Sequence, residues 1–253
     1  MTREQAEQFY AREYEKTHEP TDFYRRQRNL HADLYLRPFL KNVKTILDYG
    51  CGPGGKLSPL VDAGIDVYGF DLNPHYVEFS ESKGLRRWDP AKQYDCIFLS
   101  HTLEHWIHPK EDLGNLLERN LRPGGLVIIE VPLIDRLVLG HRRGGFHEET
   151  HLAHVWYFST STLSALLKTM SCELRYSDKV TTCVFRHNKD GVEPSLPNPM
   201  LERLRISIIE LSRNPLLARI SQRLNRSLQF VDTEFRQRMI DAQNGGNNSP
   251  AID

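Results

Sequence analysis

The stretch ILDYGCGPGG, residues 46–55, places glycines at positions 50, 52, 54 and 55 shortly after the apolar residues Ile46 and Leu47. Apolar runs of this kind fill buried parallel strands. Glycines remove side chains, so that a backbone can approach a ligand closely. Gly50, Gly52 and Gly55 satisfy the dinucleotide-binding pattern G-x-G-x-x-G. The pattern alone does not identify the nucleotide, which has to be decided from the rest of the chain.

Short apolar runs alternate with helical patterns on the C-terminal side of this loop. The strands that we predict span residues 45–49, 66–70, 94–99, 126–131, 173–176 and 181–185. The helices predicted among them span residues 57–63, 112–120 and 159–170. This alternation predicts an α/β fold with a Rossmann-like, mostly parallel sheet and helices on both faces.

Composition changes along the chain and predicts five regions. The N-terminal residues look helical in two pieces broken near Pro20, and the segment 188–199 is rich in proline and polar residues. The final segment, QNGGNNSPAID, has the composition of a disordered tail. The predicted regions are a helical lid or cap (1–42), the α/β core (43–187), a linker (188–199), a helical C-terminal extension (200–242) and the tail (243–253).

Length and charge exclude several classes of protein. The 253 residues suit one domain with an appendage, and the formal net charge of zero argues against non-specific nucleic-acid binding. No uninterrupted apolar run approaches the ~20 residues that span a bilayer, and the polar N-terminus is unlike a secretory signal. The four cysteines show no C-x-x-C spacing and favour free thiols in a reducing compartment. We therefore expect a cytoplasmic protein without a nucleic-acid partner.

Two carboxylates at predicted strand ends narrow the choice of nucleotide. Ligands in open parallel sheets bind beyond the carboxyl ends of the strands. Asp48 would repel a pyrophosphate but suits a ligand with an ammonium group, although a strand-end cap explains this residue alone. Asp71 ends the second predicted strand, where a carboxylate can accept hydrogen bonds from both ribose hydroxyls. The pair fits an adenosine with a positively charged amino-acid tail, and S-adenosylmethionine is that molecule.

Four segments in this order resemble the class I S-adenosylmethionine-dependent methyltransferases of the small-molecule and glycan type. They are ILDYGCGPGG, YGFDLNP, YDCIFLSHTLEHW and LRPGGLVIIEVP, and the resemblance covers roughly residues 40–185. It implies the fold of that family, in which an antiparallel strand pair ends the sheet, and residues 173–186 suit this pair. It also implies S-adenosyl-L-methionine as the cofactor and methyl transfer as the activity.

The resemblance implies a set of cofactor-binding residues at the ends of the first four strands. The residues of the glycine loop would line the methionine and ribose part, Asp71 would take the ribose hydroxyls, and Leu72 would lie beside the adenine. Asp89 matches the adenine-side acid of the family only loosely, and Trp88 could stack nearby. The implied set comprises Asp48, Gly50, Cys51, Gly52, Asp71, Leu72, Asp89, Ser100 and His101.

The segment HTLEH, residues 101–105, also matches the H-x-x-E-H pattern of zinc proteases. Such a site requires a helix that presents both histidines on one face. Here the segment directly follows an apolar strand, and LEH is common at this place in the methyltransferases. Related quinone-pathway enzymes carry an acid where this chain has His101. We therefore expect no metal ion at this segment.

The stretch FHEETHLAHVWYFS, residues 146–159, concentrates histidines and acids after the fifth strand. By resemblance, His154 matches a histidine that many small-molecule and glycan methyltransferases carry before a helix. A hydroxyl acceptor must lose its proton during methyl transfer, and a histidine suits that task. Three roles remain open for His154, which are general base or substrate binder, structural residue, and metal ligand. His151 and Glu148 are further catalytic candidates.

The leading hypothesis is methyl transfer to a small-molecule or sugar/glycan acceptor, with polysaccharide biosynthesis as the first choice. One alternative is a non-catalytic regulatory module that binds S-adenosylmethionine. Another is a methyltransferase of a quinone-type or other small metabolite. The intact glycine loop and the concentration of histidines and acids at residues 146–159 favour an enzyme over a regulatory module.

An apolar stripe runs through the predicted C-terminal extension. Its residues are three or four positions apart, which places them on one helical face. A stripe of this length must be covered by the protein's own core, by the same helix of a second subunit, or by a membrane surface. We predict a homodimer, with peripheral membrane contact as the alternative. The stripe consists of Leu217, Ile220, Leu224, Leu228, Val231, Phe235 and Met239.

Overall fold

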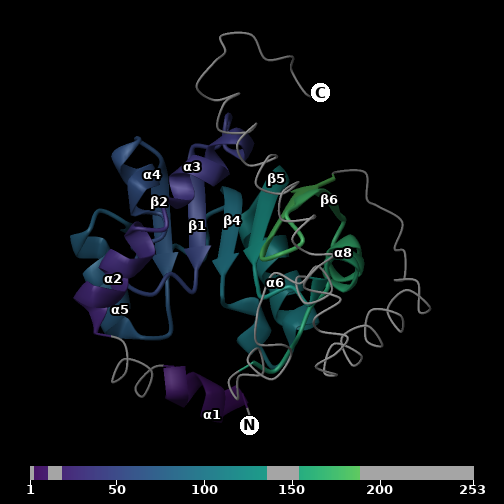
Figure 1. Cartoon of the computed structure of the whole chain (residues 1–253), viewed down its shortest axis with the longest axis horizontal. Coiled ribbons are helices and arrows are strands. Elements are labelled where there is room, and N and C mark those ends of the chain that lie inside the picture. The colour runs from purple at the N-terminus through teal and green to yellow at the C-terminus, as the bar shows by residue number, and fades with distance from the viewer. Residues whose placement is uncertain (1–2, 11–18, 136–153, 189–253) are drawn as a thin grey trace, which may run out of the picture. The chain divides into compact units, whose positions relative to one another are not determined.

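The computed structural model describes residues 3–10, 19–135 and 154–188 (Figure 1). Apart from Asp135, these residues belong to one compact unit. The predicted extension, its apolar stripe and the tail lie outside the described residues, and so do Glu148 and His151. In the part of the chain that is described, no helix combines the length and the apolar character needed to cross a membrane.

Among the described residues, seven strands form one sheet in the order β3-β2-β1-β4-β5-β7-β6 (Figure 1). Strands β1 to β5 run parallel, while β7 pairs antiparallel with both β5 and β6. The prediction of a mostly parallel sheet with an antiparallel terminal pair is therefore confirmed. The strands are β1 (Thr45–Tyr49), β2 (Asp66–Phe70), β3 (Arg86–Arg87), β4 (Tyr94–Ser100), β5 (Leu121–Glu130), β6 (Cys172–Ser177) and β7 (Thr182–His187).

Helices cover both faces of this sheet. Consecutive strand residues point to opposite sides, so apolar side chains lie on both faces and are buried under helices. In β1, Leu47 joins a core cluster that contains leucines of α6 and α8, whereas Ile46 joins a cluster with residues of α3 and α4. The described helices are α1 (Arg3–Gln8), α2 (Pro20–Arg28), α3 (Ala32–Leu36), α4 (Ser58–Asp62), α5 (Pro74–Ser82), α6 (Pro109–Asn120) and α8 (Thr160–Lys168), with short 3₁₀ helices η3 (Arg37–Phe39) and η4 (Leu103–His105).

Prolines begin several of these helices. Proline suits the first helical position, because its missing N–H would have no intrahelical partner there. Pro20 therefore starts α2, after Glu19, whose carboxylate accepts hydrogen bonds from two backbone N–H groups of the first turn. Pro109 likewise starts α6 three residues before the predicted helix at 112–120. Pro20 marks the beginning of a helix here rather than only a break.

Strand β5 begins earlier than predicted. Leu121 pairs with Tyr94, the register then shifts, and regular pairing resumes where Leu126 meets Cys96. Gly124, with φ of +78°, allows the backbone to turn within this interrupted stretch. The predicted strand at 126–131 therefore corresponds to the regular part of β5. The start of β5 was not predicted, because it contains glycines and lacks a continuous apolar pattern.

Helix α2 packs against the glycine loop. The Arg28 guanidinium donates to Asp62 at 2.6 Å and to Ser58 at 2.9 Å, which ties α2 to α4. The side-chain oxygen of Gln27 accepts a hydrogen bond from the Gly55 backbone N–H at 3.1 Å. A Cβ atom at Gly55 would lie 2.3 Å from the backbone oxygen of Tyr24, so a glycine is needed there. Helix α2 therefore helps to fix the loop from outside.

Candidate active site

A cavity of about 620 Å³ lies at the carboxyl ends of β1, β2 and β4. It occupies the place where the strand order turns back at β1 and β4, which is the usual binding crevice of an open α/β sheet. Six of the nine predicted cofactor-binding residues line it, whereas Asp48, Cys51 and Asp89 are not among the lining residues. The six are Gly50, Gly52, Asp71, Leu72, Ser100 and His101.

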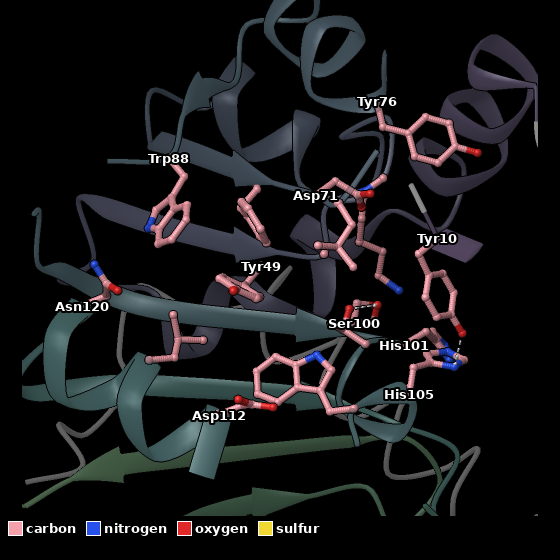
Figure 2. A pocket seen from close by; sticks show the side chains of 18 of the residues that line it. Tyr10, Tyr49, Asp71, Tyr76, Trp88, Ser100, His101, His105, Asp112 and Asn120 are labelled. Carbon is pink, nitrogen blue, oxygen red and sulfur yellow. Dashed lines mark hydrogen bonds between the residues drawn. The ribbon is translucent and has the colours of Figure 1, made fainter. Parts of the chain in front are cut away.

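Two sides of this cavity differ in chemistry (Figure 2). One side, which we term the loop wall, consists of Gly50, Gly52, Asp71 and Leu72. The other, termed the histidine wall, consists of Tyr10, His101 and His105. Figure 2 shows the three members of the histidine wall close together, with Trp88 and Asn120 at the opposite end of the cavity.

The loop after β1 follows a path that only glycine adopts readily. Gly50 and Gly52 have φ values of +89° and +54°. The Gly50 and Cys51 backbone N–H groups both donate to the carbonyl oxygen of Phe70, at 2.7 and 2.9 Å, so the loop is anchored on the end of β2. A Cβ atom on Gly50 would lie 2.3 Å from Oγ1 of Thr102. The loop thus needs glycine for both backbone conformation and space.

Asp71 links the ends of the first two strands. Its Oδ2 accepts a hydrogen bond from the Gly52 backbone N–H at 2.8 Å, and its Oδ1 accepts one from the Asn73 N–H at 2.9 Å. Burial raises the pKa of the Asp71 carboxyl above its ordinary value, while the backbone donors partly oppose this shift. The carboxylate lines the cavity and at the same time holds the glycine loop.

Asp48 lies behind the loop, where its side chain is 1% exposed. Burial, with smaller contributions from the negative charges of Glu130 and Asp71, raises the pKa of the Asp48 carboxyl to about 8, although Lys56 acts in the opposite direction. Its Oδ2 makes no hydrogen bond within the described part of the chain. A buried carboxyl of this kind is a strong acceptor for a nearby cationic group.

A polar network beside Asp48 was not predicted from the sequence. Lys56 forms a buried ion pair with Glu130 at 2.9 Å, and the hydroxyls of Ser100 and Tyr35 donate to the same carboxylate at 2.7 and 2.6 Å. Lys56 and Ser100 line the cavity. The signal in the sequence was a lysine directly after the glycine loop and a glutamate at the end of an apolar strand, two charges at buried positions.

Aromatic rings form the floor of the cavity. Tyr49 packs against Phe70 with ring centroids 4.5 Å apart, Phe70 lies 4.7 Å from Trp88, and Trp106 lies 5.8 Å from Tyr49. All four rings line the cavity, although only Trp88 was expected near the cofactor. Asp89 is exposed, and its carboxylate accepts the Ala91 backbone N–H at 2.9 Å, so it closes a turn beside this end of the cavity.

The histidine wall follows β4. His101 adopts a left-handed conformation with φ of +52°, which is uncommon for a residue with a side chain, and its Nδ1 lies 3.4 Å from Oε1 of Glu104. The Tyr10 hydroxyl and Nδ1 of His105 share a hydrogen bond of 2.8 Å (Figure 2). Of the predicted catalytic residues, only His154 is described. Its ring packs against that of His105 at 4.9 Å, and it is not among the lining residues.

A family model described as a methyltransferase domain matches residues 22–176. The chain belongs to this family. The resemblance seen in the glycine loop and the three later segments is thereby confirmed, and the cofactor of the family is S-adenosylmethionine, as predicted.

Curated relatives match part of this methyltransferase chain. The trans-aconitate 2-methyltransferase of Azoarcus sp. (strain BH72) is 33% identical over 112 residues, which cover 40% of this chain and 44% of the relative. The trans-aconitate 2-methyltransferase of Escherichia coli O139:H28 (strain E24377A / ETEC) is 27% identical over 112 residues, with the same coverage. The chain therefore spans less than half the length of these relatives.

Solved structures share the fold of this methyltransferase domain. One is an S-adenosylmethionine-bound amino pentose methyltransferase of calicheamicin biosynthesis from Micromonospora echinaspora, with a TM-score of 0.51 and 16% identity over 71% of this chain and 98% of that chain. Another is TnmH, with a TM-score of 0.56 and 18% identity over 72% of this chain and 61% of that chain. At such identities the likeness concerns the fold alone.

Proposed function

We propose that this methyltransferase transfers the methyl group of S-adenosylmethionine to an oxygen atom of a small-molecule acceptor bound in the same cavity. The observation that carries the proposal is the arrangement of the two walls. The loop wall offers glycines and a carboxylate, and the histidine wall offers imidazole and phenol groups. The cavity volume falls within the usual range of small-molecule sites.

The loop wall fits the cofactor. The Asp71 carboxylate is positioned by two backbone donors, and its further acceptor capacity suits the ribose hydroxyls. Leu72 is 42% exposed although it is apolar, so its side chain offers a surface to the adenine. Asp48 lies behind the loop and does not line the cavity, so its carboxylate would attract the positively charged amino-acid tail of the cofactor only from a distance. The loop wall therefore suits S-adenosylmethionine, and it needs no dinucleotide with a pyrophosphate group.

The histidine wall is where we place the acceptor. Methyl transfer is a displacement at an already activated carbon, so the protein mainly aligns the acceptor oxygen with that carbon and excludes water. The imidazole and phenol groups of the histidine wall can hydrogen-bond a hydroxyl or a carboxylate. His154 is adjacent to His105 but not among the lining residues, so a direct proton transfer to His154 requires a rearrangement of this wall.

A sugar or glycan hydroxyl is our first choice of acceptor, and a polycarboxylate is the second. The methyltransferase that shares the fold is named for an amino pentose, which is a sugar, and the curated relatives are named for trans-aconitate. We place the protein in the cytoplasm and its reaction in polysaccharide biosynthesis, as the sequence predicts.

Calorimetry and a turnover assay test this function. The protein should bind S-adenosylmethionine and S-adenosylhomocysteine but not NAD. Release of S-adenosylhomocysteine should be followed by mass spectrometry with nucleotide sugars, trans-aconitate and quinol-type acceptors in separate reactions. Binding of NAD without binding of S-adenosylmethionine would refute the cofactor assignment. Tight cofactor binding with no turnover in any acceptor class would favour the regulatory module.

A further inference from the structure

We propose that Glu104, His105 and His154 form a binding site for a divalent transition-metal cation, with Zn²⁺ as the expected ion. One ligand atom of each residue lies within 4.8 Å of the ligand atoms of the other two. The three residues come from two separate parts of the chain, η4 after β4 and the segment before α8. The site lies next to the histidine wall, of which His105 is a member.

Glu104 carries the strongest evidence for a cation. The residue is 1% exposed, and neither of its carboxylate oxygens makes a hydrogen bond with the described residues. A buried carboxylate without hydrogen bonds is costly unless a positive charge compensates it. Its neighbours are Nδ1 of His101 at 3.4 Å and Nε2 of His105 at 4.0 Å, and each imidazole is positive only when protonated. A cation bound between these residues would supply the compensating positive charge.

Backbone contacts bring His154 to this carboxylate. The carbonyl oxygen of Glu104 accepts hydrogen bonds from the backbone N–H groups of Val155 and Trp156, at 2.9 and 3.1 Å. The Trp156 indole N–H donates to the carbonyl oxygen of Trp106 at 2.8 Å. These hydrogen bonds hold the segment that contains His154 along η4, and they position the His154 ring beside that of His105.

The Tyr10 hydroxyl sets the orientation of His105. Metal-binding histidines commonly hydrogen-bond through their second ring nitrogen, which fixes the ring and its tautomer. The hydrogen bond of 2.8 Å between Tyr10 and Nδ1 of His105 has this arrangement, and Nε2 is then the atom that faces Glu104. Ligand atoms on one zinc ion lie roughly 3.3 Å apart, given tetrahedral bonds of about 2.0–2.1 Å. Small side-chain rotations therefore close the site around an ion.

The donor set selects the kind of ion. Two imidazole nitrogens and one carboxylate favour zinc and related transition metals, whereas Mg²⁺ and Ca²⁺ prefer oxygen ligands. Three protein ligands leave at least one coordination position open, as in catalytic zinc sites. Because His105 lines the cavity, that position is accessible to an acceptor. A metal role for His154 was one of three that the sequence left open, and the proposal departs from the expectation of no metal ion at residues 101–105.

The catalytic consequence rests on the proposed function. An ion held by Glu104, His105 and His154 would act as a Lewis acid: it would lower the pKa of an acceptor hydroxyl bound to it, and the hydroxyl proton would pass to water. The acceptor oxygen then forms a bond to the methyl carbon with its electron pair. The bond between that carbon and the sulfonium sulfur breaks, and its electron pair stays on sulfur to give S-adenosylhomocysteine. No residue of the histidine wall has to accept the proton in this sequence of events.

Metal binding is tested without any turnover. Metal-free full-length protein is titrated with Zn²⁺ in the presence of a chromophoric competitor, and Co²⁺ serves as a spectroscopic probe of the ligands. One equivalent should bind, and Mg²⁺ should not compete. Glu104→Gln, which keeps the size but removes the charge, should weaken Zn²⁺ binding by more than about 100-fold, and Tyr10→Phe by roughly 10–100-fold, as for other partners of metal-bound histidines.

Matched controls keep this proposal open to refutation. His108→Asn alters an exposed histidine a few residues away and should leave Zn²⁺ affinity unchanged. His151→Asn tests the histidine-rich stretch outside the described residues. If His151→Asn removes Zn²⁺ binding while Glu104→Gln keeps it, the site is assigned wrongly. If wild-type protein binds S-adenosylmethionine but no Zn²⁺, this inference fails and the proposed function stands. If it binds Zn²⁺ but not the cofactor, the proposed function fails instead.

Discussion

The Asp71 carboxylate accepts the backbone N–H of Gly52 across 2.8 Å, so the residue assigned to the ribose also holds the glycine loop in place. Asp71 follows β2 and Gly52 lies in the loop after β1. The two strands are neighbours in register, from Thr45 beside Asp66 to Tyr49 beside Phe70. Recognition of the cofactor and the geometry of the loop are therefore coupled through one side chain.

Substitution of Asp71 by alanine should affect both properties. We expect S-adenosylmethionine binding to weaken by roughly 1.5–3 kcal/mol, the range for hydrogen bonds to a charged group. The melting temperature of the cofactor-free protein should fall too, because two backbone donors lose their acceptor. Calorimetry and thermal unfolding measure the two effects. Asp66→Ala, at the opposite end of β2, is the control, and equal cofactor affinities in the two variants would contradict the ribose assignment.

Gly50→Ala and Gly64→Ala separate backbone strain from steric conflict. Both glycines have φ values near +90°, but a Cβ atom at Gly64 meets no atom within 4 Å, whereas at Gly50 it meets Thr102. A left-handed alanine costs about 1–2 kcal/mol at either position. Gly50→Ala should lower the free energy of unfolding further and also reduce cofactor binding. Equal losses in urea unfolding would mean that Thr102 moves aside without cost.

The pH dependence of cofactor binding should report on Asp48. Its raised pKa means that the folded, cofactor-free protein keeps a proton on this carboxyl between about pH 4 and pH 8, where the unfolded chain does not. Stability of the cofactor-free protein should therefore fall as the pH rises through this window, by up to about 1.4 kcal/mol per pH unit. A cationic ligand favours the ionised carboxylate, so binding at pH 7 should release a proton.

Calorimetry in buffers of different ionisation enthalpy counts that proton. Asp48→Asn should abolish the proton release and should make the cofactor-free protein less sensitive to pH between 4 and 8. Proton release that persists in Asp48→Asn would assign the titration to another group.

His154→Ala should reduce turnover by about 10²–10⁴, if the residue serves as a general base. If His154 is instead a metal ligand, His154→Ala should also lose turnover, and excess Zn²⁺ should restore part of it. Cofactor affinity should stay near the wild-type value in both cases, because His154 is not among the residues that line the cavity. His151→Ala should be milder. Near-normal turnover of His154→Ala would remove both roles.

The apolar strands and the glycine loop could be predicted from the sequence because their signals are local. Strand β3 could not, since Arg86 and Arg87 are exposed and carry no apolar pattern. The buried ion pair of Lys56 with Glu130 joins residues far apart in the chain, and so does the contact of His105 with His154. Such contacts depend on sheet order and on the backbone hydrogen bonds of Glu104, neither of which a sequence pattern records.

The two walls of the cavity come from different stretches of chain, and this has an evolutionary consequence. The loop wall derives from residues 50–72, whereas the histidine wall derives from the N-terminal segment and from residues 101–105. Mutations that change the choice of acceptor can therefore accumulate in the histidine wall without disturbing recognition of the cofactor by the loop wall. A directed-evolution library restricted to the histidine wall, at positions 10, 101 and 105, would explore new acceptors while the residues that bind the cofactor stay unchanged.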